Sequence, residues 1–266
     1  METRKYSQID IKVPAHHNSL LEKTLALINE DVEIKTLWRI NNINAIDRLG
    51  MTDHGVVHFQ IVANISLRLA RILTKNQVIM SITRNYDLSN DYAELVILLA
   101  SLFHDLGMSI SREGHEEFSL IISNTILHRI LDFLPVEERT IVTSETLHAI
   151  IAHRSDGIPY TVEAGIVRVA DALDMSEGRS RIPYQAGKID IHAVSAAAID
   201  KVEIQEGTEK RPIQINIWMN NIAGIFQVDE LLRHKLLGSG IEKFVKVSAY
   251  LSEGEEKRLV KEFEIA

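Results

Sequence analysis

The chain has 266 residues, and its 45% hydrophobic and 25% charged residues are typical of an ordinary globular protein. It contains no cysteine, which excludes disulfides, thiolate nucleophiles and cysteine-ligated metals. Histidines and carboxylates therefore remain as candidate metal ligands. The net charge of −8 disfavours long nucleic acid as a partner, because such binding depends on positive charge. Glycine (13) and proline (5) are scarce, which favours a helix-rich fold.

Two features bear on location. The longest apolar run, residues 95–103, is about half as long as a membrane-spanning helix needs to be. The first five residues are polar or charged apart from Met1, with no hydrophobic leader. We therefore expect a cytoplasmic protein with no membrane partner.

Helical patterns begin near the N-terminus. Apolar residues at helical spacing predict two amphipathic helices between Ser19 and Leu49. A third is expected to begin at Thr52 and Asp53, whose side-chain oxygens are suited to cap it, and its apolar stripe continues to about Leu73.

The most apolar helix is predicted around residues 95–103, which are hydrophobic on nearly every side. We expect this helix to begin at Ser89 or Asn90, to lie at the centre of a bundle and to end with Gly107 as its C-terminal glycine. Three further helical patterns follow, near residues 115–133, 136–153 and 161–173.

The hydrophobic period changes near Pro183. Ile213–Met219 alternates with period two, as a half-buried strand does, and a short helix with Leu236 is stopped by Gly238. Further strands are predicted at residues 189–194, 201–204, 244–251 and 259–265. We therefore predict a helical domain over residues 1–182 and a small α+β domain over residues 183–266 that forms a lid or a dimer face.

Several of the eleven histidines lie close to carboxylates. His54 and His58 are spaced i and i+4, so that on one helix both would face one pocket. His104 and Asp105 end the most buried helix, where two polar groups are costly unless something such as a divalent cation compensates them.

His115, His153 and Asp171 also lie in or beside predicted helices. Imidazoles and carboxylates without thiolates suit Mn, Fe, Co, Ni or Zn, and open coordination positions would leave room for water. The residue types thus indicate a metal site before any family is considered.

Three blocks then resemble the H…HD…D signature of the HD-domain metal-dependent phosphohydrolases. The blocks are His58 with Val62 and Ala63, His104-Asp105-Leu106-Gly107, and Val169-Ala170-Asp171. The resemblance covers residues 50–182, with the blocks in the family's order. Residues 149–157 and 166–174 are also similar to the branch whose extra histidines hold two metals, which includes the HD-type dinucleoside tetraphosphate hydrolases.

The resemblance implies a mainly α fold, with an HD-type helical bundle followed by the small α+β domain. It implies one or two divalent transition metals as cofactor, with Asp105 bridging the two ions. The implied ligands are His58, His104, Asp105 and Asp171 for the first metal, and His115 and His153 for the second.

Other residues are candidates by position. Arg179 and Arg181 follow the last ligand and carry the guanidinium groups that fit phosphate oxygens, although a solvated charged turn is an equal alternative. Arg154 and Arg168 are weaker candidates of the same kind. Asp174 is a candidate proton relay to the leaving group. His54 is a second candidate for that relay, and a supporting structural histidine is the alternative for it.

The remaining histidines are expected to be ordinary surface or hydrogen-bonded residues, and His148 is predicted to face away from His153. No Walker A motif or GxSxG elbow occurs. The ordinary residues are His16, His17, His128, His192 and His234.

These observations favour an enzyme that hydrolyses a phosphate ester or anhydride of a small molecule, most of all a nucleotide, with metal-activated water. A homodimer is compatible with this interpretation. Two alternatives remain open: a regulatory module that binds a nucleotide or metal without turnover, and a diiron oxygenase on the same scaffold.

Overall fold

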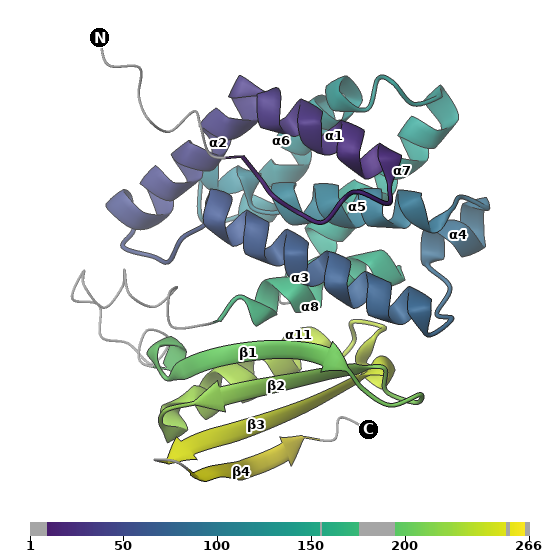
Figure 1. Ribbon diagram of the computed structural model, residues 1–266. Coiled ribbons are helices and arrows are strands. Elements are labelled where there is room, and N and C mark those ends of the chain that lie inside the picture. Colours follow the sequence, from purple (N-terminus) through teal and green to yellow (C-terminus); the bar gives the residue numbers. More distant parts are fainter. Residues whose placement is uncertain (1–9, 155, 176–194, 254–255, 264–266) are drawn as a thin grey trace.

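The helices and the sheet form two layers, with the sheet packed beneath the helical layer (Figure 1). The computed structural model describes residues 10–154, 156–175, 195–253 and 256–263. The helices of the first layer are α1 (Ser19–Glu30), α2 (Val32–Asn42), α3 (Val56–Lys75), α4 (Ser81–Tyr86), α5 (Asn90–Phe103), α6 (His115–Ile130), α7 (Val136–Ala152) and α8 (Val162–Leu173). This mainly helical architecture confirms the predicted fold class.

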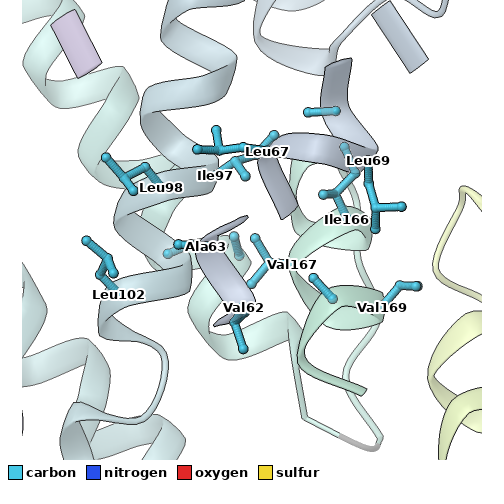
Figure 2. Packing of buried hydrophobic residues seen from close by; sticks show 14 of the residues in the cluster. Val62, Ala63, Leu67, Leu69, Ile97, Leu98, Leu102, Ile166, Val167 and Val169 are labelled. Atoms are coloured by element: carbon cyan, nitrogen blue, oxygen red, sulfur yellow. The ribbon is translucent and has the colours of Figure 1, made fainter. Parts of the chain in front are cut away.

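Helix α5 is the centre of the helical layer. Its residues from Ala93 to Phe103 are all buried, and it packs against α1, α3, α7 and α8. Burying one such Leu or Ile side chain contributes about 1.5–3 kcal/mol. Figure 2 shows the packing of α3, α5 and α8 through Val62, Ala63, Leu67, Leu69, Ile97, Leu98, Leu102, Ile166, Val167 and Val169.

Two segments, Val56–Lys75 and Asn90–Ser109, are long and apolar enough to cross a membrane by length and composition alone. Their apolar windows are 56% and 89% buried inside the protein, as is common for helices of a protein core. The absence of a membrane partner stays a prediction.

The start of α3 differs from the predicted one. The helix begins at Val56, so Thr52 and Asp53 both precede it and Gly55 is the N-cap residue. Asp53 still acts on the helix end, because its Oδ1 accepts hydrogen bonds from the backbone N–H groups of Gly55 (2.9 Å) and His58 (3.2 Å).

The expectation that Gly107 ends α5 is wrong. The helix ends at Phe103 and Ser89 caps its start, whereas Gly107 lies in a following 3-10 turn, Leu106–Ser109. A side chain at Gly107 would place its Cβ 1.9 Å from the backbone oxygen of His115. Glycine is therefore required there for the close approach of this turn to α6 and not for a left-handed helix end.

The second layer is a four-stranded sheet in the order β1-β2-β3-β4. The outer pairs are antiparallel and β2–β3 is parallel, joined by a π-helical turn (Gln227–Leu232) and α11 (Arg233–Leu236). The strands are β1 (Ile199–Glu206), β2 (Ile213–Met219), β3 (Val245–Glu253) and β4 (Glu256–Phe263).

The alternation of Ile213–Met219 is confirmed, because Ile213, Ile215, Ile217 and Met219 are fully buried on one face. β1 and β4 begin two to three residues before the predicted strands. The predicted strand at residues 189–194 lies outside the described residues, as does the boundary near Pro183. The division into two domains stays a prediction.

The α+β unit packs directly onto the helical layer. α11 and the preceding π-helical turn contact α8, and β2 contacts α3. At Gly165 of α8 an added Cβ would lie 2.0 Å from the backbone oxygen of Ser239, which sits between Gly238 and Gly240, both with positive φ. Glycines in both segments, Gly165 in α8 and Gly238 and Gly240 in the turn after α11, thus allow their backbones to come close.

We expect Gly165→Ala to destabilise the protein. Alanine favours helices over glycine by about 1 kcal/mol, but the backbone clash with Ser239 costs about 1–3 kcal/mol or more. The free energy of unfolding from urea titrations measures the balance. Asn124→Ala, an exposed position of α6, is the control and is expected to be neutral or slightly stabilising. A Gly165→Ala protein as stable as the wild type would contradict the close approach.

Candidate metal centre

The centre lies at one end of α5, where three helices of the helical layer meet. His58 comes from the first turn of α3, His104 and Asp105 follow the last turn of α5, and Asp171 lies in the last turn of α8. His58, His104 and Asp105 are buried, and the side chain of Asp171 is 17% exposed. Helix ends far apart in sequence thus deliver all four groups to one point.

The first set of donor atoms is formed by these four residues. His58 Nε2 lies 3.1 Å from His104 Nε2, and Asp171 Oδ1 lies 3.5 and 3.7 Å from these nitrogens. Asp105 Oδ2 lies 3.8 and 3.6 Å from the same two atoms. Two nitrogens and two carboxylate oxygens therefore converge, as the ligands of one divalent ion would.

A second set forms around the other oxygen of Asp105. Asp105 Oδ1 lies 3.1 Å from His115 Nε2 and 3.5 Å from His153 Nε2. Glu116 adds a carboxylate whose oxygen lies within 4.8 Å of the donor atoms of these two histidines. Because its two oxygens face the two sets, Asp105 has the geometry of a bridging ligand.

The hydrogen-bond partners of the histidines suit a bound cation. Nδ1 of His104 lies 3.0 Å from the carbonyl oxygen of Ser101, and Nδ1 of His58 lies 2.6 Å from Asp174 Oδ2. A carbonyl oxygen only accepts hydrogen bonds, so the proton of His104 is on Nδ1 and its Nε2 carries a lone pair. Asp174 Oδ2 as the acceptor likewise places the proton of His58 on Nδ1, so that two lone pairs face each other at 3.1 Å. A bound cation converts this repulsion into coordination.

The second pair of histidines has the same arrangement. Nδ1 of His115 lies 2.9 Å from the oxygen of Arg112, and Nδ1 of His153 lies 2.5 Å from the oxygen of Ile150. Each Nε2 thus faces Asp105 Oδ1: it donates a hydrogen bond when it carries the proton, and it offers a lone pair to a metal when the proton is on Nδ1.

The charges of the centre also suit a cation. Burial lowers the pKa of His104 to about 3, so this imidazole stays neutral. Burial alone would raise the pKa of Asp105, but His104 and hydrogen bonds from His115 and His153 hold it well below its usual range. For Asp171, burial is likewise outweighed, chiefly by the ammonium group of Lys235, and its pKa is lowered. Two ionised carboxylates thus lie among imidazoles in a buried site.

The geometry assigns Asp174 a different task from the predicted proton relay. It is buried behind His58, on the side opposite Nε2, and accepts the hydrogen bond from Nδ1. A carboxylate in that position orients the imidazole and strengthens it as a ligand. The structure therefore favours an orienting residue.

His54 lies beside the centre for another reason than the predicted helical spacing. It precedes α3, so the i and i+4 argument is wrong, yet its ring centroid is 5.7 Å from that of His58. Its Nδ1 lies 2.8 Å from the oxygen of Thr52. His54 stays a candidate at the edge of the first set.

The predicted phosphate-binding arginines are not brought to the centre within the described part of the chain. Arg154 is on the surface and forms ion pairs with Glu117 and with Asp156 (3.1 Å). Arg168 is buried and donates hydrogen bonds to backbone carbonyls, so the phosphate role considered for it is wrong. Arg179 and Arg181 lie outside the described residues.

Among the other histidines, His148 faces away from the centre as predicted. Its Nε2 accepts a hydrogen bond from the N–H of Tyr160 (2.9 Å), and the two rings stack at 4.7 Å. His16 and His17 pair with Glu22 and Glu94. His192 lies outside the described residues.

Sequence reasoning missed Lys235. Its Nζ lies 3.3 Å from Asp171 Oδ2 and also donates to the backbone oxygen of His153. No motif or spacing could indicate it, because it comes from α11 of the other layer, far along the chain from both partners.

The chain combines a helical bundle, a buried centre of His and Asp side chains, and a small α+β layer. The HD domain matches residues 56–176, which include His58, His104, Asp105, His153 and Asp171. The chain is 41% identical over 218 residues to an uncharacterized protein, MJ1020, of Methanocaldococcus jannaschii, covering 82% of this chain and 84% of that protein. No solved structure matches the chain. The chain therefore belongs to the HD-domain family.

We expect protein purified without chelators to contain about two divalent ions per chain, because the two oxygens of Asp105 face two donor sets. Elemental analysis should show that His153→Ala lowers the content toward one ion and that Asp105→Asn weakens both sites. His148→Ala, on the same helix as the turn of His153, is the matched control and should keep both ions. Unchanged metal content in His153→Ala would contradict the second site.

For Asp174→Asn we expect metal affinity to fall about 10–100-fold, as when a carboxylate behind a ligating histidine is removed. Competition with a fluorescent chelator measures this. If Asp174 instead relays protons, its variant would bind metal normally and lose only turnover, which would restore the relay role.

Proposed function

We propose that this protein is a metal-dependent phosphohydrolase that acts on a nucleotide or another small phosphorylated molecule. The observation that carries the proposal is the placement of Asp105, with one oxygen toward each donor set. Bound divalent ions would neutralise phosphoryl oxygens and lower the pKa of a water molecule toward neutrality. The HD domain is typical of this class of enzyme.

The residues of the chain would hold and shape this chemistry. His58 and His104 turn their Nε2 atoms toward the ion position because their Nδ1 atoms bond to Asp174 and to the oxygen of Ser101. Asp105 and Asp171 supply the negative charge that balances a cation. The donor set requires no protein nucleophile, since imidazoles and carboxylates that bind ions leave the attack on phosphorus to water.

Access to the centre is expected from the side of Asp171. Its side chain is 17% exposed, whereas those of His58 and His104 are completely buried. Arg179 and Arg181 follow Asp171 by eight and ten residues and stay predicted contacts for a distal phosphate. The apolar helices behind the two histidines exclude water from the opposite side.

The nucleotide is proposed from the resemblance to two-metal HD hydrolases. A cytoplasmic location, a homodimer and the absence of long nucleic acid as a partner stay predictions. Mn, Fe, Co, Ni and Zn all suit imidazole and carboxylate donors, so the identity of the ion is a matter for the assay.

Anaerobic phosphate release from nucleoside mono-, di- and triphosphates and dinucleoside polyphosphates, with each metal added in turn, tests the proposal. Anaerobic turnover would contradict a diiron oxygenase. Metal binding without hydrolysis of any phosphate ester or anhydride would contradict the proposal and favour a regulatory module.

We expect Asp105→Asn to lower turnover by several orders of magnitude while the fold is retained, because the amide keeps the shape but not the bridging charge. Steady-state kinetics with the best substrate measure the loss. Asp132→Asn, at an exposed carboxylate, is the control and should leave kcat unchanged. An active Asp105→Asn enzyme would show that another group bridges the ions.

A further inference from the structure

One ammonium group from the α+β layer reaches both donor sets of the metal centre. Lys235 lies on α11 (Arg233–Leu236), and its Nζ is 3.3 Å from Asp171 Oδ2. The same Nζ donates to the backbone oxygen of His153. The side chain is 15% exposed, so water competes little for these contacts.

The contact is directed at the unused oxygen of Asp171. Oδ1 of Asp171 faces His58 and His104 at 3.5 and 3.7 Å, whereas Oδ2 faces Lys235. A cation on Oδ2 disfavours rotation of the carboxylate and leaves a single oxygen toward the ion. Lys235 thus favours metal binding through one oxygen of Asp171 over binding through both.

Arg168 holds the backbone of α11 at Lys235. Its guanidinium group donates to the backbone oxygens of Lys235 (3.0 Å) and His234 (3.4 Å), and to those of Ala152 (3.2 Å), Gly157 (2.7 Å) and Arg154. The first two carbonyls belong to α11 and the others surround His153 at the end of α7. One buried arginine therefore ties the backbone of Lys235 to the backbone of the second ligand set.

We propose that Lys235 is a positioning residue of the metal centre, which fixes Asp171 as a one-oxygen ligand and links it to the turn of His153. The inference rests on the proposed metal centre. It makes the α+β layer a structural part of that centre, while the lid or dimer face expected from the sequence stays a separate prediction.

A titration of metal-free protein with Co²⁺ alone tests the inference, because binding and the visible spectrum of the ion report ligand geometry without any substrate. We expect Lys235→Met, which keeps the length of the side chain, to lower Co²⁺ affinity at one site about 10–100-fold and to change the spectrum. Lys235→Arg keeps the charge and should restore much of the affinity. Arg233→Met is the matched control, since Arg233 lies on the same helix in an exposed pair with Asp229, and should leave both measurements unchanged.

A double-mutant cycle separates positioning from a general effect on folding. If Lys235 acts through Asp171, Lys235→Met should cause little further loss of Co²⁺ affinity in an Asp171→Asn protein. Equal losses in the two backgrounds would overturn the inference. The free energy of unfolding of each metal-free variant verifies that the comparison is made on folded protein.

Kinetics distinguish this inference from the proposed function. With an active wild-type enzyme, Lys235→Met should lower kcat more than it raises KM. A raised KM with unchanged Co²⁺ affinity would make Lys235 a substrate contact and overturn the inference. If the wild type binds Co²⁺ but hydrolyses no phosphate compound, the proposed function fails while the Co²⁺ titration still decides the role of Lys235.

Discussion

This structure depends on one constraint. At the end of the buried helix α5, two imidazole lone pairs face each other beside ionised carboxylates. Burying such charges costs several kcal/mol for each ion unless a partner of opposite charge is present. His58 and His104 approach to 3.1 Å, and Asp105 and Asp171 lie on the same side. α3, α5 and α8 must therefore converge at one end, and the apolar packing along their length supplies the stability that makes this arrangement possible (Figure 2).

Helix termini explain why the ligands lie where they do. The last carbonyls of a helix have no partner within the helix. His104 and His153 each follow a last turn and bond through Nδ1 to the carbonyl three residues earlier, and His115 does so with the turn before α6. Each bond satisfies a backbone group and turns Nε2 toward the centre. His58 lies in the first turn of α3, where unpaired groups are N–H donors, and Asp174 supplies the acceptor that the backbone does not.

The parts predicted from the sequence are those determined by local pattern. The continuous apolar run of α5 fits only a buried helix, and the alternation of β2 fits only a half-buried strand. The candidate ligands can be predicted because one motif contains them all: His58, His104, Asp105 and Asp171. Gly107 was misassigned because its requirement is a backbone contact with α6, which no local signal reports. His54 lies near His58 through a turn and not through helical spacing. Lys235 is set by the docking of α11 on α8, a tertiary contact between distant segments.

This docking shows how a remote layer can belong to a site. Gly165 allows the backbone of Ser239 to approach α8, and this approach places α11 over the last turn of that helix, where Asp171 lies. Arg168, on the same helix, then binds the carbonyls of α11 and of the turn at His153. Three residues of α8 therefore have linked tasks. Asp171 is a candidate metal ligand, Arg168 joins two backbone segments, and Gly165 leaves room for the second layer. We therefore expect a change in how the α+β layer packs to alter the orientation of Asp171, because Lys235 and Arg168 both join α11 to this part of α8.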